Sequence, residues 1–203
     1  MITIVDYGLG NLGSIRNMFN KIGCEVAVSS EKSAIQQASK IILPGVGAFD
    51  KAMGSINESG LKEVLEQKAL EERVPFLGIC LGMQLLTNSS DEGKLSGFGW
   101  IPAVTKTFSF ENGTNLKVPH MGWNDVYKST PSQLTEDLPE DPRFYFVHSY
   151  YVKVEDCQHS ILQAVHGLEF DCGIQKDNIM GVQFHPEKSH KYGMKLLKNF
   201  MEL

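Results

Sequence analysis

The amino-acid sequence predicts an α/β fold in which helices flank a central, mostly parallel sheet and an antiparallel strand elaboration extends it. In the N-terminal half, short apolar runs alternate with segments of helical periodicity, and this order needs the crossover connections of a parallel sheet. In the C-terminal half, strand-like runs follow one another with no helix between them. A single domain over residues 1–203 fits a chain of this length.

The parallel part is predicted from four apolar runs and the helical segments between them. The run at 2–7 predicts a buried first strand, and Gly23 is placed to end a helix over 11–23. Ser30 is a candidate N-cap for a helix over 31–40. The other predicted elements are strands at 24–28, 41–44 and 74–79, a long connection containing PGVGAFDKAM and SINESG, and a helix over 60–72.

The antiparallel part follows a polar, glycine-bearing loop at 88–99. Its strand-like segments are WIPAVTKTF, LKVPHMGW, FYFVHSYYVKV and ILQAVHG. The segment 190–202 has apolar residues at helical spacing and predicts a C-terminal helix.

The composition argues against a nucleic-acid-binding, secreted, membrane-spanning or metal-binding protein. The net charge of −5 gives no electrostatic reason to expect nucleic acid or anionic membrane as a partner. The first residues have no basic region of a signal peptide, and no apolar run approaches the roughly 20 residues that cross a bilayer. The four cysteines are widely separated and show no metal-binding spacing. We therefore expect a cytoplasmic protein without a metal site.

Residues 8–13, GLGNLG, match G-x-G-x-x-G between a predicted strand and a predicted helix. A dinucleotide site also needs an acidic residue at the end of the next strand, where this chain has Val28-Ser29-Ser30. The pattern is therefore weak evidence for a dinucleotide, and the alternative is that the glycines only permit a tight turn.

Cys80 is the first candidate for chemistry. It lies between Gly78 and Gly82 where a predicted strand changes into a helix, the spacing of the G-x-S-x-G nucleophile elbow. Such a corner projects the thiol outward and places it at backbone N–H groups, with Leu81 N–H the nearest donor for an oxyanion. The alternative is a buried structural cysteine, the usual fate of a free thiol.

His185 is the candidate base because it ends an apolar run and has a carboxylate, Glu187, two residues later. Pro186 keeps His185 out of the helical conformation, and in an extended segment residues i and i+2 project to the same side. Glu187 can then orient the imidazole, which gives a Cys–His–Glu triad. In PGVG at 44–47, bare backbone up to Gly47 can approach a ligand and offer a second oxyanion donor.

These segments, in this order, resemble the class I (triad-type) glutamine amidotransferases. GICLGMQ and GVQFHPEKS are shared by many members, whereas PGVGAF and VPHMGWN resemble most closely the glutaminase subunits of imidazole glycerol phosphate synthase. The resemblance spans nearly the whole chain and implies a flavodoxin-like class I glutaminase fold.

The resemblance also implies roles for individual residues. It makes Cys80 the nucleophile, His185 the general base and acid, and Glu187 the residue that orients it. The residues implied to hold L-glutamine are Gln84, Glu92 and the backbone of Ser149 and Tyr150. The residues implied to face a partner are Gly10, Asn11, Trp123, Tyr145 and Lys188.

The implied activity is hydrolysis of L-glutamine to glutamate and ammonia without a cofactor, for histidine biosynthesis. One glutaminase domain accounts for the whole chain, so the resemblance implies a heterodimer with a separate (β/α)8-barrel cyclase that receives the ammonia. Three alternatives stay open: a paralogue that supplies ammonia for sugar amidation in surface polysaccharides, a partner-independent cysteine hydrolase, and a non-enzymatic flavodoxin-like binding module. A glutaminase serving pyridoxal phosphate synthesis is less favoured because of PGVGAF.

Overall fold

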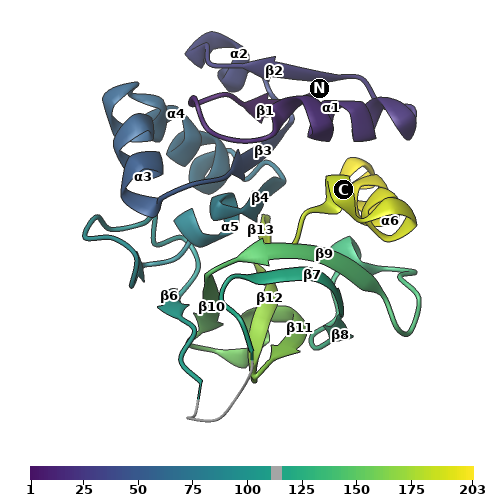
Figure 1. Ribbon diagram of the computed structural model, residues 1–203. Helices are drawn as coiled ribbons and strands as arrows, with labels where there is room; N and C mark the ends of the chain where they lie inside the picture. The colour runs from purple at the N-terminus through teal and green to yellow at the C-terminus, as the bar shows by residue number, and fades with distance from the viewer. Residues whose placement is uncertain (111–115) are drawn as a thin grey trace.

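The computed structural model describes residues 1–110 and 116–203, and its elements are shown in Figure 1. The helices are α1 (Leu12–Lys21), α2 (Lys32–Gln36), α3 (Phe49–Glu58), α4 (Leu61–Glu66), α5 (Leu81–Leu85) and α6 (His190–Glu202). A π-helical turn η1 (Gln67–Glu71) extends α4, and short 3-10 turns are η2 (Gln133–Thr135), η3 (Cys157–His159) and η4 (Pro186–Lys188).

The strands divide at the middle of the chain. The N-terminal strands are β1 (Ile2–Val5), β2 (Val26–Ser29), β3 (Lys40–Gly45), β4 (Phe76–Cys80) and β5 (Ser89–Ser90). The C-terminal strands are β6 (Ala103–Thr107), β7 (His120–Asp125), β8 (Tyr127–Lys128), β9 (Arg143–His148), β10 (Tyr150–Val154), β11 (Ser160–His166), β12 (Leu168–Lys176) and β13 (Ile179–Val182).

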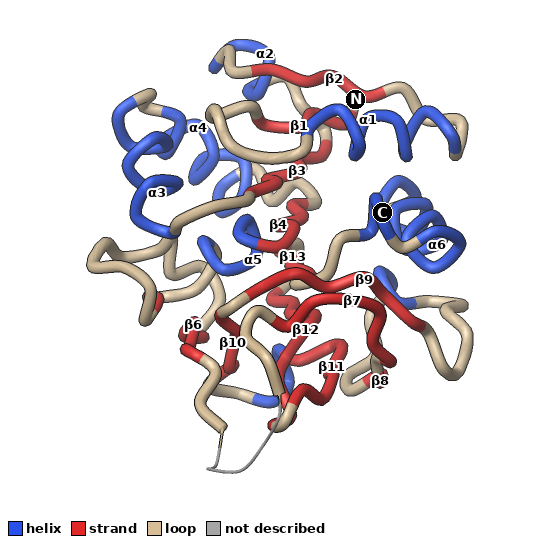
Figure 2. The backbone as a smooth tube through the Cα atoms, in the orientation of Figure 1, coloured by secondary structure: helices blue, strands red, loops and turns tan. Residues whose placement is uncertain are grey.

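The main sheet has the predicted parallel part and antiparallel extension. Its order is β2-β1-β3-β4-β13-β12-β10-β6-β5, and β11 also pairs with β12 and carries β8 on its other side. The strands from β2 to β13 are parallel, and β13 then pairs antiparallel with β12. β7 and β9 form a separate antiparallel pair. Figure 2 shows that helices gather around the parallel part, whereas the extension consists mostly of strands and loops.

Both faces of the central parallel strands are buried, which explains their continuous apolar runs, whereas the edge strand β2 is only partly buried. Ile4 and Ile42 pack into one apolar cluster with α1 and α6, while Ile41 and Leu43 pack into a second cluster with α3 and α4. Figure 1 shows the two helix groups on opposite sides of the sheet. The carboxyl ends of β3, β4 and β13 therefore meet between two packed layers, which holds them rigidly.

Three local predictions were wrong and one strand was missed. The helix predicted over 31–40 is shorter, because α2 ends at Gln36 and β3 begins at Lys40. The connection after β3 contains helix α3, whose buried face is Phe49, Ala52, Met53 and Ile56 at helical spacing. The glycines near this segment led to the prediction of a loop in place of a helix. Ser30 does not cap α2, because Glu31 occupies the N-cap position and donates its N–H to Ser29 Oγ at 3.0 Å. β12, the longest strand of the described chain, was not predicted because its charged ends mask the buried centre.

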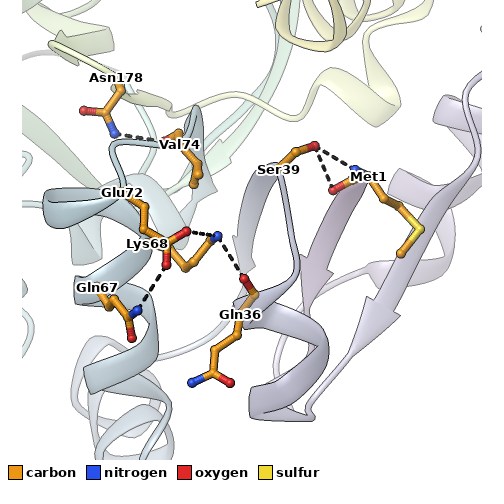
Figure 3. A network of polar contacts seen from close by, with 8 residues as sticks. All are labelled: Met1, Gln36, Ser39, Gln67, Lys68, Glu72, Val74 and Asn178. Atoms are coloured by element: carbon orange, nitrogen blue, oxygen red, sulfur yellow. Dashed lines mark hydrogen bonds and ion pairs between the residues drawn. The ribbon is translucent and has the colours of Figure 1, made fainter.

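A polar network ties the elements together at the amino ends of the parallel strands (Figure 3). The Lys68 ammonium, almost completely buried, donates to Gln36 O at 3.0 Å and pairs with Glu72. Asn178 Nδ2 donates to Val74 O at 2.8 Å, which joins the segments that enter β4 and β13. These contacts lie at the end of the sheet opposite Cys80. None of the helices within the described ranges has the length and apolar character needed to cross a bilayer.

Candidate active site

Cys80 occupies the corner between β4 and α5. Its backbone has φ 56° and ψ −112°, a region that residues other than glycine rarely adopt. Cys80 stands opposite Gly45 of β3 in the parallel register, so packed strands fix the corner from the side. Strain of this kind is characteristic of functional sites, where the surrounding structure holds an unfavourable conformation in place.

The glycines on either side of Cys80 are required by close backbone packing. A Cβ at Gly78 would lie 2.6 Å from Gly82 O, and a Cβ at Gly82 would lie 1.8 Å from Leu43 O. Both distances are far inside van der Waals contact. The G-x-C-x-G spacing therefore has a steric reason: any larger residue at either glycine would collide with neighbouring backbone.

His185 follows β13 and is paired with the predicted carboxylate. Its Nδ1 lies 2.7 Å from Glu187 Oε1, and both side chains are buried. Burial acts to lower the pKa of His185, but interactions with Cys80 and Glu187 outweigh it and raise the pKa to about 10. His185 Nε2 has no hydrogen-bond partner within the described residues. The imidazole is therefore held by Glu187 on one side and left free on the other.

A pocket of about 330 Å³ opens over Cys80 and brings together most of the predicted site. The predicted residues that line it are Gly47, Cys80, Leu81, Gln84, Glu92, Ser149, Tyr150, His185 and Lys188. They come from the ends of strands and the segments that follow them: the turn after β3, the corner from β4 to α5, the loop after β5, the turn from β9 to β10, and the segment from β13 into η4. Its size suits a small polar molecule.

The predicted substrate-binding and oxyanion residues have defined supports. Gly47 has φ +102°, a conformation that favours glycine. Gln84 Nε2 lies 3.4 Å from Tyr150 O, and Glu92 Oε2 accepts the backbone N–H of Phe49 at 3.0 Å. Glu92 thus joins its loop to the start of α3. Their roles toward a substrate stay predictions.

Two contacts of the site were missed in the sequence. Gln183 is fully buried; its Nε2 donates to Cys80 Sγ at 3.7 Å and its Oε1 accepts from Gln84 Nε2 at 3.0 Å. Its position as the one polar residue within the apolar run IMGVQF was an available signal. Tyr7 donates its hydroxyl to Pro44 O at 2.7 Å, and burial together with the charge of Cys80 raises the pKa of Tyr7. No sequence spacing links Tyr7 to Pro44.

The predicted partner-facing residues divide into two groups. Trp123 and Tyr145 are opposite each other on β7 and β9, with ring centroids 6.2 Å apart, and Lys188 Nζ lies 5.7 Å from the Tyr145 ring. Gly10 packs near Pro44, and the Asn11 side chain makes no capping hydrogen bond to α1. Their contact with a partner stays a prediction.

A model of the class I glutamine amidotransferase family matches residues 3–203. The chain belongs to this family. The chain is therefore a glutamine amidotransferase with the predicted α/β fold, and the catalytic roles of Cys80, His185 and Glu187 stay predictions.

Curated relatives match over the full length. The chain is 52% identical to imidazole glycerol phosphate synthase subunit HisH 2 of Methanococcus maripaludis, with 100% of this chain and 99% of the relative covered. It is 50% identical to subunit HisH of Bdellovibrio bacteriovorus, with both chains fully covered. It is 45% identical to subunit HisH 2 of Pseudomonas aeruginosa, again with full coverage.

Solved structures share the fold at low sequence identity. One described as a glutamine amidotransferase has a TM-score of 0.75 at 15% identity, and covers 100% of this chain and 98% of its own. The PurLQS structure from Thermotoga maritima has a TM-score of 0.71 at 19% identity, with 99% and 97% covered. These similarities confirm the predicted fold class.

Proposed function

We propose that this chain is the cytoplasmic glutaminase subunit of an imidazole glycerol phosphate synthase, in the pathway of histidine biosynthesis. The observation that carries the proposal is the pocket in which a strained Cys80 lies beside a buried His185–Glu187 pair. The full-length relatives named as subunits of that synthase support the choice among glutaminases.

In the proposed reaction, the Cys80 thiolate attacks the carboxamide carbon of L-glutamine. The oxygen of the tetrahedral intermediate accepts hydrogen bonds from Leu81 N–H and from the backbone of the PGVG segment that ends at Gly47. His185 has a raised pKa of about 10, so it holds a proton at neutral pH and gives it to the departing ammonia. The carbon–nitrogen bond breaks and a thioester remains on Cys80.

The second half of the reaction uses the same residues in reverse order. His185, now neutral, takes a proton from a water molecule, and the resulting hydroxide attacks the thioester. The carbon–sulfur bond breaks, glutamate leaves, and the thiolate–imidazolium pair is restored. Glu187 Oε1 accepts a hydrogen bond from His185 Nδ1–H throughout, at 2.7 Å, and so keeps Nε2 facing the reaction.

The proposed partner is a (β/α)8-barrel cyclase that forms a heterodimer with this chain. Ammonia released into water would mostly become ammonium and lose its nucleophilicity, so direct transfer to a bound acceptor is favoured. The exposed face of Trp123 on β7, continuous with Tyr145 and Lys188 at the pocket, is the proposed contact surface.

One observation favours a second candidate for the molecule that accepts the ammonia. Two of the relatives, at 52% and 45% identity, have names that end in the numeral 2, as second copies of a subunit do. A second copy can supply ammonia to a different reaction, such as amidation of a surface sugar. Both acceptors need the same glutaminase chemistry at Cys80.

The test of the proposed function separates ammonia production from ammonia use. Cys80→Ala should abolish glutamine hydrolysis, while the assembled synthase should still form product from added ammonium salt. Cys157→Ala, which removes an exposed cysteine outside the pocket, is the matched control and should leave both activities intact. Loss of the ammonium-dependent reaction in Cys80→Ala would contradict a separable ammonia source.

A further inference from the structure

Two buried histidines beside the active site have no part in the reaction above. His120 on β7 and His148 on β9 stand opposite each other, with His120 Nδ1 2.8 Å from His148 Nε2. His120 Nε2 lies 3.2 Å from Asn124 Nδ2, and His148 Nδ1 lies 2.7 Å from Tyr150 O. The contacts form one continuous chain from Asn124 to the Tyr150 carbonyl.

The ends of this chain fix the direction of every hydrogen bond in it. The Asn124 amide is oriented at both ends, because its Oδ1 accepts Asp125 N–H at 2.9 Å and its Nδ2 donates to Val165 O at 2.9 Å. The second N–H of the same Nδ2 faces His120 as a donor. The Tyr150 carbonyl can only accept. Each imidazole must therefore accept at Nε2 and donate from Nδ1, which makes both rings neutral.

The surroundings keep both rings neutral. Burial lowers the pKa of His120 to about 4, with a smaller contribution from His166, whose ring stacks on it at 4.2 Å. Burial lowers the pKa of His148 to about 3; the hydrogen bond to Tyr150 opposes this, and the neighbouring histidines His120, His166 and His185 add to it. The relay Asn124–His120–His148–Tyr150 is thus intact at neutral pH.

The relay ends at a carbonyl that belongs to the pocket. Tyr150 O is also the acceptor of Gln84 Nε2 at 3.4 Å. Gln84 Nε2 in turn contacts Gln183 Oε1, and Gln183 Nε2 contacts Cys80 Sγ. A rotation of the Tyr150 peptide would therefore move Gln84, and through Gln84 the Gln183 side chain that contacts Cys80 Sγ.

We propose that His120 and His148 are positioning residues, and that their one-way hydrogen-bond relay from Asn124 fixes the Tyr150 carbonyl and Gln84 for binding the amino-acid end of glutamine. The inference rests on the proposed function of the chain as a glutaminase. It assigns the PHMGWN segment a task inside the subunit, because two of its residues, His120 and Asn124, are members of the relay.

Asn124→Asp is a nearly isosteric change that makes the direction of the relay depend on pH; it also removes the donor to Val165 O at every pH, so only the pH-dependent part of its effect tests the relay. The introduced carboxylate can only accept a hydrogen bond, so it stabilises the form of His120 that carries a proton on Nε2. The pKa of His120 should therefore rise from about 4 toward neutrality. While His120 is protonated it still donates from Nδ1 to His148, and the relay holds. Once His120 loses its second proton, Nδ1 becomes an acceptor, His148 must donate from Nε2, and its Nδ1 lone pair then faces the Tyr150 carbonyl.

The predicted signature is a pH-dependent KM for glutamine. In the full synthase carrying Asn124→Asp, KM should rise about tenfold between about pH 5 and about pH 8, the effect of losing a buried hydrogen bond, while the parent KM stays flat. His166→Phe keeps a ring stacked on His120 without joining the relay, and is the matched control with the parent profile. A flat KM in Asn124→Asp would overturn the proposal.

A second pair of variants separates hydrogen bonding from packing. His120→Phe fills the space but cannot donate, so it should raise KM about tenfold and change kcat by less than about threefold. His120→Asn retains a donor near the position of Nδ1 and should recover most of the lost affinity. Equal KM values in these two variants would contradict a positioning role and indicate packing alone.

Nitrogen NMR of the histidine side chains tests the relay without any activity. In the parent chain, both rings should show a protonated Nδ1 and an unprotonated Nε2 at neutral pH, and a protonated His148 Nε2 would overturn the relay. If the parent synthase hydrolyses no glutamine, the proposed function fails, whereas an active parent with the wrong tautomers rejects only this inference.

Discussion

At the scale of single residues, the site depends on one imidazole that keeps its proton at neutral pH. His185 has a pKa of about 10 because Cys80 and Glu187 stabilise its charged form more than burial penalises it. A group of this kind is charged below its raised pKa and loses its proton only as the pH rises through it. The residue proposed as the acid for ammonia is therefore protonated throughout the physiological range.

Glu187→Gln keeps a hydrogen-bond acceptor for His185 Nδ1 but removes the negative charge. The pKa of His185 should fall, so the alkaline loss of kcat should begin at a lower pH than in the parent. Near neutral pH the variant should lose less activity than His185→Ala, which removes the proton donor and should cost about 10²-fold or more.

The measurement is kcat for glutamine as a function of pH, with Glu202→Gln, an exposed glutamate far along α6, as the matched charge control. An unchanged alkaline limb in Glu187→Gln would show that Glu187 does not set the protonation of His185. A loss equal to that of His185→Ala would require a second role for Glu187.

The corner at Cys80 and the contact between His185 and Glu187 could be predicted from sequence because both depend on residues close together in the chain. Cys80 has its glycines within two residues, and His185 has its carboxylate within two residues. The His120–His148 contact could not be predicted, because it depends on the register of β7 against β9, 28 residues apart. The contact between Gln183 and Cys80 could not be predicted either, because the two residues are 103 positions apart and meet only through the pairing of strands.

At the scale of elements, the corner from β4 to α5 is the tightest part of the site. The Gly82 backbone lies so close to β3 that an added Cβ would be 1.8 Å from Leu43 O. The backbone of β3 cannot shift to make room for this Cβ, because β3 is paired with β1 on one side and with β4 on the other. The corner therefore tolerates no side chain at this position without a shift of a central strand.

Gly82→Ala should lower the free energy of unfolding by about 3 kcal/mol and abolish glutaminase activity. Gly54→Ala in α3 is the matched control, because no heavy atom lies within 4 Å of its added Cβ. That change should stabilise the chain by up to about 1 kcal/mol through helix propensity and leave activity intact. Urea denaturation followed by circular dichroism gives both values; equal stability of the two variants would contradict the packing account.

The parallel strands and the C-terminal helix were predictable because each is a continuous pattern within one segment. Strands β1, β3 and β4 are buried on both faces, and α6 was predicted over its full observed range of 190–202. Helix α3 was missed because the glycine-rich PGVG turn leads directly into it. The prediction of a long connection gave the glycines of the turn more weight than the helical spacing of the apolar residues that follow.

At the scale of the whole molecule, the two ends of the parallel sheet have different tasks. The carboxyl ends hold Cys80 and the pocket, while the amino ends hold the network around Lys68 (Figure 3). The Lys68 ammonium joins α2 to the turn after α4 through Gln36 O and Glu72. We expect this network to support stability and not chemistry.

Lys68→Met keeps the length of the side chain but leaves Gln36 O without its donor. It should lower the free energy of unfolding by about 2 kcal/mol and leave kcat and KM for glutamine unchanged. Lys62→Met is the matched control, since Lys62 and Glu66 form an exposed pair at 3.8 Å that should contribute less than about 0.5 kcal/mol. A change in glutaminase kinetics in Lys68→Met would contradict the separation of the two ends.

The most direct measurement of the central claim is the rate of glutamine hydrolysis by this chain, alone and with the imidazole glycerol phosphate synthase cyclase of the same organism. We predict slow hydrolysis alone, strong stimulation by the cyclase, and a further increase with the cyclase's nucleotide ligand. Full activity without the cyclase would contradict the account and indicate a partner-independent hydrolase. No stimulation, with Cys80 still modified by a glutamine analogue, would contradict the histidine-pathway assignment and point to a different ammonia acceptor.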